Sequence, residues 1–362
     1  MAQQEDRDVG DGVRGLAEPV MLVRGAGGGD GDGDGDELRK FRCWAFPSHN
    51  ATVSVFWSLF LVNGTERPKS PAAAAGGLDH NRIYFDQPDE RWAAAVPGFD
   101  VVVLSAGQWY LNSAMFYDRG AVIGCHRCPE RNRTETGFFG VFRLAVRNAL
   151  REVITRVAGT SSSSSPARPQ LAVVTTFSPA HFEGEWDSPT ACVRTEPYAR
   201  GEREMEYMDK EMLRAGVEEA AAAGADARAR GAGLAVEALQ VTRLAAMRPD
   251  GHPGLYTRAF PFAEGARDRM PNDCVHWCLP GPTDTWNEIL LQIVKRWADG
   301  VAIAMNHSLP REVRSYRPSG RLVGRFWSKP LQIGSNYWMG DFGSNPWKWV
   351  RIRITPIHRQ DL

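Results

Sequence analysis

Apolar side chains recur at helical spacing in three stretches of the chain. The clearest pattern covers residues 283–298, a similar one covers residues 138–157, and a third helix is predicted for about residues 202–223. Spacings of three and four residues place apolar side chains on one face of a helix. In the first two stretches these side chains are Trp286, Ile289, Leu290, Ile293, Val294 and Trp297, and Phe142, Ala145, Val146, Ala149, Leu150 and Val153.

Four stretches have the patterns of strands. Residues 52–57 alternate polar and apolar side chains, which predicts a strand with one buried face. Residues 101–104 and 171–174 are short apolar runs, typical of strands buried on both faces of a parallel sheet. A further strand is predicted within residues 235–244. Because strands alternate with helices, and residues 138–157 connect the two apolar strands as a crossover helix, we expect an α/β domain over residues 38–300.

The two ends of the chain differ from this middle part. Residues 1–37 contain a Gly-rich run and alternating Asp and Gly, a composition too poor in apolar side chains to form a core, so this head is predicted to be disordered. Residues 301–362 form a basic, Trp-containing tail without sustained periodicity. For this tail we expect either an extension without a specific fold or a surface that stacks on sugar rings or single-stranded nucleic acid.

The chain carries 43 basic and 43 acidic residues, so its formal net charge is zero. This balance argues against a nucleic-acid partner, because such binding depends on neutralising phosphates. The net charge of zero results from an acidic N-terminal segment and a basic C-terminal segment. The first 40 residues contain ten acidic and five basic side chains, whereas residues 301–362 contain three acidic and ten basic ones.

Several features favour an oxidising, secretory compartment. The chain has six cysteines, and four Asn-X-Ser/Thr glycosylation patterns begin at Asn50, Asn63, Asn132 and Asn306. The sequence as written shows neither a signal peptide nor an apolar stretch long enough to cross a membrane. We expect disulfides, in a pairing that the sequence leaves open.

The densest group of reactive side chains lies directly before the helix predicted for residues 283–298. Asp273 stands three residues ahead of His276. A carboxylate at this spacing can orient one imidazole nitrogen, as the acid does in a Ser-His-Asp acyl-transfer site. The pattern is short, and a hydrogen-bonded histidine in a surface loop is the alternative interpretation.

Soft ligands for zinc are also present. They are Cys125, His126 and Cys128, together with Cys274, His276 and Cys278. The second group lacks a Cys-X-X-Cys that would match the first, which weakens the interpretation as a zinc site. We therefore expect these cysteines to form disulfides and the protein to bind no metal.

Ordered motif blocks extend from residue 41 to about residue 300. They read FRCWAFPSHN from residue 41, SAGQW from residue 105, TFSPAHFE from residue 176, RPDGHP from residue 248 and DCVHWCLPG from residue 273. With these blocks the chain resembles the plant trichome birefringence-like family of polysaccharide O-acetyltransferases, members of the PC-esterase group related to SGNH/GDSL hydrolases. The segments GCHRC and RPDGHPG resemble its xyloglucan branch. The resemblance implies a three-layer SGNH-hydrolase-like α/β domain with a mainly parallel sheet.

The resemblance also implies roles for individual residues. His276 would be the general base, Asp273 its orienting acid, and Gly107 a candidate for the backbone amide that binds the oxyanion. In the family the nucleophile is the serine of a Gly-Asp-Ser block that lies ahead of the W-X-F-P segment. No Gly-Asp-Ser occurs in this sequence. The sequence therefore contains the base and its acid but not the family's nucleophile.

Four further residues are candidates for substrate binding. Asp250 and His252 would contact a sugar or join the site, or else would stabilise a turn flanked by Pro and Gly. Trp109 and Trp277 would form a platform for sugar rings, or else would pack in the core.

The resemblance implies an O-acetyltransferase-like protein that acts on hydroxyls of a plant cell-wall polysaccharide in the Golgi. An acetyl donor would be the cosubstrate, no cofactor would stay bound, and the family is anchored in the membrane. The missing Gly-Asp-Ser block motivates an alternative, a polysaccharide-binding protein without turnover. A third possibility is an acetylesterase, in which water replaces the sugar hydroxyl as acceptor.

Overall fold

The structure, a computed structural model, describes residues 21–22, 41–46, 51–67, 80–128, 134–159, 168–256, 265, 270, 272–308 and 351–354. For residues 21–22, 302–308 and 351–354 the description covers the backbone alone. Most of the predicted head 1–37, most of the tail 301–362, and the glycosylation patterns at Asn50 and Asn132 lie at least partly outside the described residues. The predicted division into head, domain and tail stays a prediction.

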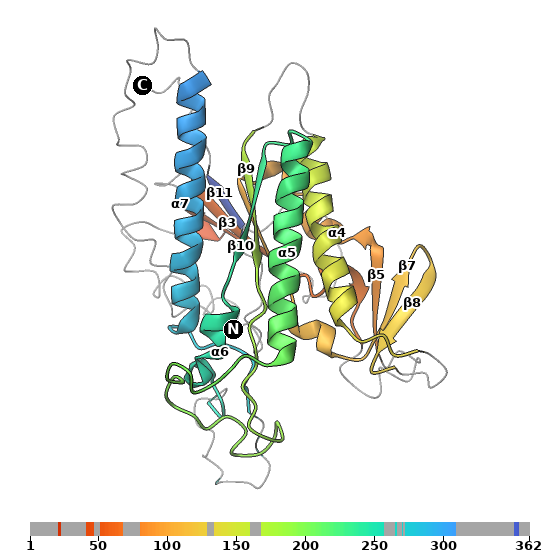
Figure 1. The fold of residues 1–362 in the computed structure, drawn as a ribbon, viewed down its shortest axis with the longest axis vertical. Coiled ribbons are helices and arrows are strands. Elements are labelled where there is room, and N and C mark those ends of the chain that lie inside the picture. The colour runs from red at the N-terminus through yellow and green to blue at the C-terminus, as the bar shows by residue number, and fades with distance from the viewer. Residues whose placement is uncertain are drawn as a thin grey trace, which may run out of the picture.

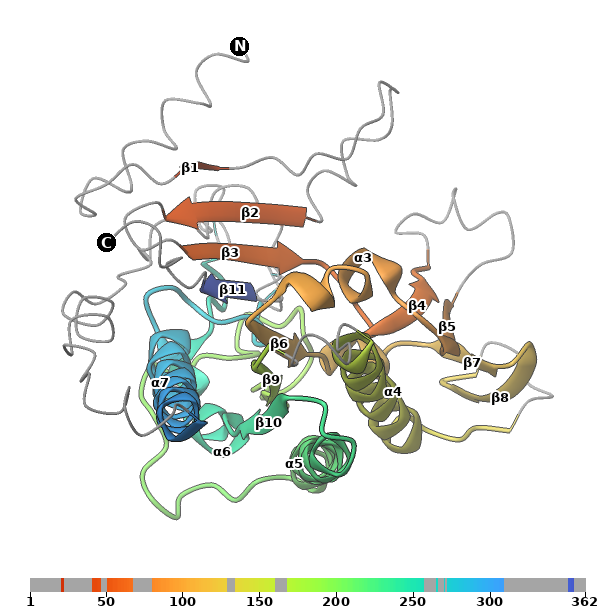
Figure 2. The same cartoon turned by 90° about the horizontal axis from the view of Figure 1, so that it is seen from above.

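A seven-stranded sheet forms the centre of the fold (Figures 1 and 2). Its strands, in spatial order, are β1 (Met21–Leu22), β2 (Phe41–Phe46), β3 (Ala51–Phe56), β11 (Arg351–Ile354), β6 (Val101–Ser105), β9 (Gln170–Thr175) and β10 (Leu234–Leu239). β6, β9 and β10 pair parallel, and the remaining neighbours pair antiparallel. The sheet is therefore mixed, with its parallel part confined to three strands, which corrects the expectation of a mainly parallel sheet. β2 and β3 are close in sequence, and strands joined by a short connection pair antiparallel.

Helices cover both faces of the parallel strands, which gives three layers (Figure 2). Val102 and Leu104 of β6 belong to the core that contains α4 (Phe139–Ala158) and α5 (Tyr207–Ala229). Val101 and Val103 belong to a second core with α6 (Thr242–Ala246) and α7 (Pro282–Ser308). Successive side chains of a strand point to opposite faces, so each parallel strand supplies both cores. The predicted α/β class is confirmed.

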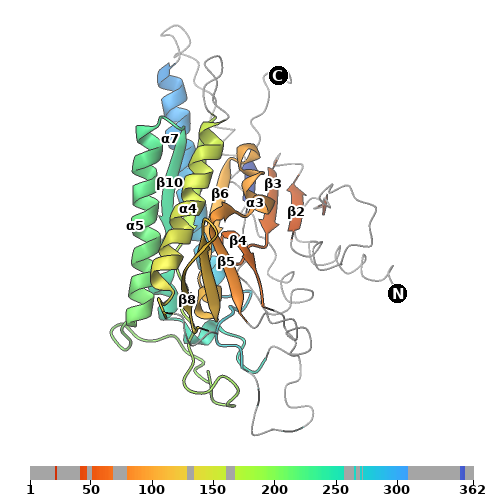
Figure 3. The same cartoon turned by 90° about the vertical axis from the view of Figure 1, so that its right-hand side faces the viewer.

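The three helices predicted from apolar spacing are present, but two of them begin or end several residues away from the expected positions. α4 matches the predicted crossover helix, and α4 and α5 run side by side (Figure 3). α5 begins five residues later than expected because Glu206 and Asp209 form a capping box there, and it continues to Ala229. α7 extends past the expected end and past residue 300, to Ser308.

The strand predicted within residues 235–244 ends earlier than expected. β10 ends at Leu239, and residues Thr242–Ala246 form α6 instead. The cause is Thr176, whose Oγ1 accepts hydrogen bonds from the backbone N–H groups of Val241 and Thr242, at 3.0 and 3.3 Å. These bonds take backbone donors that a longer strand would have used, and the chain turns into the helix.

A second, smaller sheet was not predicted from the sequence. It contains β4 (Val62–Thr65), β5 (Asn81–Pro88), β7 (Ala114–Asp118) and β8 (Ala121–His126). α4 packs against β5, where Asn148 donates from its side chain to the carbonyl of Phe85 (2.8 Å). Short helical segments complete the described chain: α3 (Glu90–Ala93), η3 (Val96–Gly98), η4 (Gln108–Leu111) and η5 (Pro249–Gly251). Among the described residues, no helix is both long and apolar enough to cross a bilayer.

Tyr110 is expected to contribute measurably to stability. Its side chain is fully buried, and its hydroxyl donates to the carbonyl of Phe60 (2.7 Å). Tyr110→Phe should lower the free energy of unfolding by about 1–3 kcal/mol, because the buried carbonyl loses its partner. Urea unfolding measures this loss. Tyr84→Phe is the control, since the Tyr84 ring is partly exposed and stacks on Tyr117 at 5.0 Å. Equal losses in both variants would contradict the prediction.

Candidate functional site

Asp273 and His276 form a hydrogen-bonded pair in the segment that leads into α7. His276 Nδ1 lies 2.6 Å from Asp273 Oδ2. Asp273 Oδ1 accepts from the backbone N–H groups of Val275 (3.1 Å) and His276 (2.8 Å), so the carboxylate also organises the turn that carries the histidine. An imidazole that donates from Nδ1 to a carboxylate has Nε2 as its basic nitrogen. The geometry is that of a base with its orienting acid.

The surroundings keep Asp273 ionised. The side chains of His276 and Asp273 are 22% and 10% exposed. Burial by itself would raise the pKa of Asp273, but the His276 ring and the backbone N–H groups of His276 and Val275 outweigh burial and lower that pKa below its ordinary value. An ionised Asp273 can hold His276 in one tautomer and stabilise the imidazolium that forms when His276 takes up a proton.

This low pKa predicts a specific pH dependence of stability. Because the pKa is lower in the folded chain, Asp273 stabilises the fold above its unfolded pKa of about 3.9, and this contribution is lost as the pH falls through the folded pKa. Asp273→Asn should therefore be less stable than the native protein at neutral pH, and the difference should shrink as the pH falls below about 4.

Urea unfolding at a series of pH values measures that difference. Asp226→Asn is the control, since Asp226 pairs with Arg230 on the surface of α5 (2.8 Å) and surface substitutions change stability by about 0.5 kcal/mol or less. A difference between Asp273→Asn and the native protein that stays constant down to about pH 3 would contradict the interpretation.

The pair lies near segments that follow the carboxyl ends of the parallel strands. The backbone N–H of His181, in the loop after β9, donates to the carbonyl of Cys274 (2.9 Å). Gly254, after η5, exchanges two backbone hydrogen bonds with Asp273 (2.9 and 3.0 Å). In open α/β sheets ligands bind at the carboxyl ends of the strands. The position of Asp273 and His276 agrees with that rule.

A disulfide anchors the same segment. Cys192, in the loop after β9, pairs with Cys274, directly beside Asp273. Cys125 pairs with Cys128 at the end of β8, whereas Cys43 and Cys278 carry free thiols. The structure thus decides the pairing that the sequence left open. The first bond uses both cysteines of the group around His126, and the second uses Cys274 of the group around His276. No cluster of His, Cys, Asp and Glu suited to a metal occurs within the described residues.

Gly107 follows β6 at the same edge of the sheet. A side chain here would collide with the core, because an added Cβ would lie 2.6 Å from Cδ2 of Phe177. The next residue, Gln108, donates from its side chain to the carbonyl of Ser178 (2.9 Å), which joins the ends of β6 and β9. The close packing accounts for glycine at this position. Its role as an oxyanion-binding residue stays a prediction.

The four candidates for substrate binding lie in different environments. Asp250 is paired with Arg248 (2.9 Å), which supports the interpretation as a stabilised turn. His252 donates to the carbonyl of His276 (2.6 Å), so it joins the site by contact with the backbone of the base. Trp277 is 4% exposed and packs between His252 and Trp286, with ring centroids 4.1 and 5.2 Å away. Trp109 is partly buried against the core of α4 and α5.

For Trp277 the structure favours core packing, the second of the two predicted alternatives, because a buried ring cannot present a face to a sugar. His181 is a site residue that sequence reasoning missed. It is 2% exposed and lies 2.7 Å from His252. The TFSPAHFE block contains it, but nothing in the sequence brings a residue of that block to one 71 positions later.

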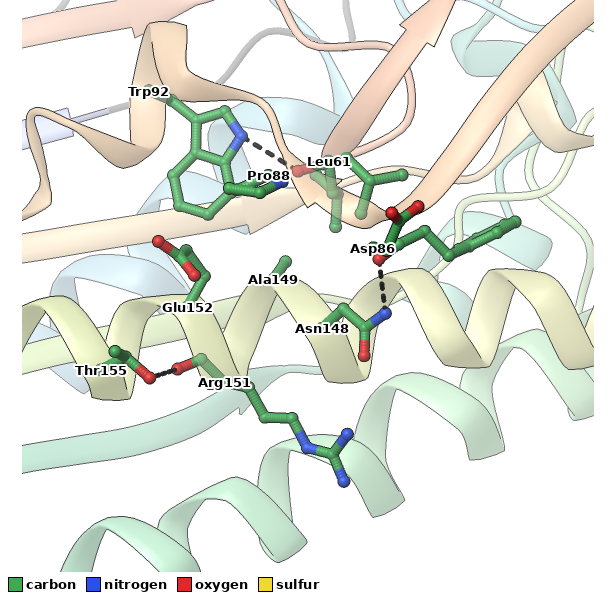
Figure 4. A pocket seen from close by; sticks show the side chains of 11 residues that line it. Leu61, Asp86, Pro88, Trp92, Asn148, Ala149, Arg151, Glu152 and Thr155 are labelled. Carbon is green, nitrogen blue, oxygen red and sulfur yellow. Dashed lines mark hydrogen bonds between the residues drawn. The ribbon is translucent and has the colours of Figure 1, made fainter. Parts of the chain in front are cut away.

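A cavity of about 230 Å³ lies elsewhere, between α4 and the β4, β5 and α3 segments (Figure 4). Trp92 donates from its indole to the carbonyl of Leu61 (3.1 Å), and Asn148 bonds the backbone of β5. These polar groups already have partners, and the cavity contains none of the predicted site residues. Its lining consists of Leu61, Val62, Phe85, Asp86, Pro88, Trp92, Asn148, Ala149, Arg151, Glu152 and Thr155.

Comparison with known proteins agrees with this fold. Residues 31–293 match PC-Esterase, the GDSL/SGNH-like acyl-esterase family found in Pmr5 and Cas1p. Xyloglucan O-acetyltransferase 2 of Populus trichocarpa is 49% identical over 261 residues, 72% of this chain and 58% of that protein. Xyloglucan O-acetyltransferase 1 of Arabidopsis thaliana is 47% identical over 262 residues, 72% of this chain and 56% of that protein.

A more distant relative is protein trichome birefringence-like 26 of Arabidopsis thaliana, 36% identical over 255 residues, 69% of this chain and 52% of that protein. The chain thus spans somewhat more than half the length of these curated relatives. The predicted resemblance, including its xyloglucan branch, is confirmed by the family match and by the names of the relatives. The chain belongs to the PC-Esterase family.

Proposed function

We propose that this chain takes part in the transfer of acetyl groups to hydroxyls of a plant cell-wall polysaccharide, with xyloglucan as the acceptor. The observation that carries the proposal is the 2.6 Å contact between Asp273 and His276, in a chain whose relatives are named xyloglucan O-acetyltransferases. A base with an orienting acid is what acyl transfer through a serine requires.

The proposed chemistry is a double displacement. Nε2 of His276 takes the proton of a serine hydroxyl as the serine oxygen attacks the acetyl carbonyl of the donor. The bond between the acetyl group and the donor breaks, and the leaving group takes the proton from His276. A sugar hydroxyl then gives its proton to His276 and attacks the acetyl-serine, and the serine regains a proton as its bond to the acetyl group breaks. Asp273 stabilises the imidazolium in both halves.

The serine is the part of this scheme that the sequence does not contain in the family's form. The chain has no Gly-Asp-Ser. In the proposal, a segment outside this sequence supplies that block and completes the site formed by Asp273 and His276. Without a nucleophile, most of the rate enhancement of such a site is lost.

We also propose that the protein works in the Golgi, where it meets its acetyl donor and its polysaccharide. Two disulfides support an oxidising compartment. Asn63 is exposed on β4 and begins a glycosylation pattern, so it is accessible to a glycan. Mass spectrometry of the protein from plant tissue should find a glycan on Asn63.

The transfer is tested with two proteins, this chain and a fusion in which the Gly-Asp-Ser segment of a family member precedes it. Each is incubated with an acetyl donor and xyloglucan or xylan oligosaccharides, and acetylated product is measured by mass spectrometry. We expect product from the fusion, and a preference for xyloglucan. Transfer by the fusion no greater than that of its His276→Ala variant would overturn the proposal, and acetate release without acetylated sugar would identify an acetylesterase.

The missing Gly-Asp-Ser block favours a second candidate function for the chain on its own, polysaccharide binding without turnover. A serine-directed fluorophosphonate probe separates the two. Covalent labelling near Asp273 and His276 in the unfused chain would exclude the non-catalytic function. Binding of xyloglucan without labelling and without transfer in either protein would support it.

A further inference from the structure

Two buried histidines lie behind the candidate base. His181, in the loop after β9, is 2% exposed, and His252, which follows η5, is 9% exposed. Their rings are in direct contact, with Nδ1 of His181 2.7 Å from Nε2 of His252. Each ring also contacts a backbone carbonyl. His181 Nε2 lies 3.1 Å from the oxygen of Ala246, and His252 Nδ1 lies 2.6 Å from the oxygen of His276.

These contacts determine how many protons the two rings hold. A carbonyl oxygen only accepts hydrogen bonds, so His181 Nε2 and His252 Nδ1 each carry a proton. The contact between the rings needs a third proton, because two bare nitrogens would otherwise face one another at 2.7 Å. Two neutral imidazoles carry two protons on their four nitrogens. The observed contacts require three protons on these nitrogens, one more than two neutral rings hold.

We propose that His181 and His252 share one proton, that the pair carries a single positive charge, and that it positions the backbone of His276 for proton transfer. The shared proton follows from the contacts alone, whereas the positioning role rests on the proposed function. With this pair, His276 is held at two points. Asp273 orients its ring at 2.6 Å, and His252 holds its carbonyl oxygen at the same distance.

The surroundings contain groups that favour and groups that oppose the charge. Burial opposes it and is the largest cause that lowers the pKa of His181 and of His252 to about 4, and for His252 the neighbouring His181 adds to this lowering. Arg203 lowers the pKa of His181 further, and Asp250 and Glu206 raise it. Asp273 raises the pKa of His252, and His276 lowers it. Three carboxylates therefore face the pair from the segments packed against it.

The contact between the two rings favours the protonated, positively charged pair, as the carboxylates do. Loss of the shared proton would leave two lone pairs at 2.7 Å, and one of the two carbonyl contacts would have to break to relieve this repulsion. The His181 contact with Ala246 is the longer of the two, at 3.1 Å, so it is the one that would be lost. The pair thus binds its third proton more tightly than an isolated buried histidine does.

Trp277 gives further support to a charged pair. Its ring lies against His252 with centroids 4.1 Å apart, and His181 meets it edge to face at 5.9 Å. A cation within about 6 Å of the centroid of an indole ring is attracted by its face. The burial of Trp277 is explained by this contact, since the ring covers the pair instead of lining a surface for sugars.

Nuclear magnetic resonance of the protein labelled with ¹⁵N-histidine tests the shared proton without any requirement for activity. We expect, at about pH 6, three protonated nitrogens on the two rings and one proton signal far downfield for the bridge. On raising the pH the two rings should lose this proton in a single common step. Two neutral rings throughout the pH range in which the protein is folded, or two independent protonation steps, would overturn the proposal.

The variant His181→Gln tests whether the bridging signal comes from this pair and whether the pair positions His276. A carboxamide at this position donates from its NH₂ group to Nε2 of a neutral His252, so the bridging signal and the positive charge should vanish while His252 still donates to His276. His126→Gln is the control, since His126 pairs with Glu135 in the smaller sheet (2.9 Å) and should leave the signal unchanged.

In the fusion that carries Gly-Asp-Ser, His181→Gln should lower the rate of transfer by about 10- to 100-fold and remove one inflection from its pH profile, because the backbone of the base is held less rigidly. An unchanged rate and pH profile would overturn the positioning role. If no fusion transfers acetyl groups at all, the proposed function fails, and the spectrum of the native protein still decides whether the proton is shared.

Discussion

Replacement of His276 by alanine is expected to lower the rate of acetyl transfer by at least about 10⁴-fold in the fusion that carries Gly-Asp-Ser. His276 is the group that takes the proton from the attacking hydroxyl in both halves of the proposed reaction. Asp273→Asn should lower the rate by about 10³- to 10⁴-fold, because an amide at this position favours the wrong tautomer of the imidazole. Binding of the oligosaccharide should change little in either variant, since neither side chain is proposed to hold the sugar.

Transfer rates under saturating acceptor measure this effect, with affinity for the oligosaccharide measured separately. The chain offers a matched control in His126 and Glu135, which form a second histidine–carboxylate pair in the smaller sheet (2.9 Å). His126→Ala should leave the rate within about a factor of two, since His126 lies in β8 of the smaller sheet and belongs to none of the segments that form the site. A loss of less than about tenfold in His276→Ala would show that this residue is not the base.

The disulfide between Cys192 and Cys274 is expected to have the largest single effect on stability. It joins residues 82 positions apart, and replacing both by serine should lower the free energy of unfolding by about 4–5 kcal/mol, because the unfolded chain regains the freedom of a long loop. The bond also ties the loop after β9 to the segment that carries Asp273 and His276. We therefore expect its loss to disorder the pair as well.

Urea unfolding of the double variant measures the loss, and the ring signals of His276 report the disorder. Cys125 and Cys128 are the internal control, because they are three positions apart and their removal should lower the free energy of unfolding by only about 2 kcal/mol in the same chain-entropy treatment. Equal losses for the two disulfides would contradict the assignment of the effect to loop length.

Local patterns predicted the layered part of the fold well. The apolar spacing of residues 138–157 and 283–298 reappears as α4 and α7, and the apolar runs at residues 101–104 and 171–174 lie within β6 and β9. Such patterns are readable because each helix or strand buries the face that its own sequence makes apolar. The end of β10 was not readable, because it depends on Thr176, which comes from another strand end.

The smaller sheet was missed for a related reason. β5 and β7 pair parallel in the middle of this sheet, and β4 and β8 lie at its edges. In sequence, β6 of the larger sheet lies between β5 and β7, so the order of elements does not show that these two strands belong together. β5 does bury alternate apolar side chains, Ile83 and Phe85. That short pattern is typical of a strand but does not say which strand it pairs with.

The sequence by itself determined the α/β order of the domain and placed Asp273 within reach of His276, because both depend on residues within a few positions of one another. Only the tertiary structure decided which cysteines pair, that Trp277 is buried, and that His181 meets His252 behind the base. These contacts join residues tens of positions apart in sequence. They form only when the strand ends and the loops that follow them are brought together, and short-range patterns carry no information on which distant segments will meet.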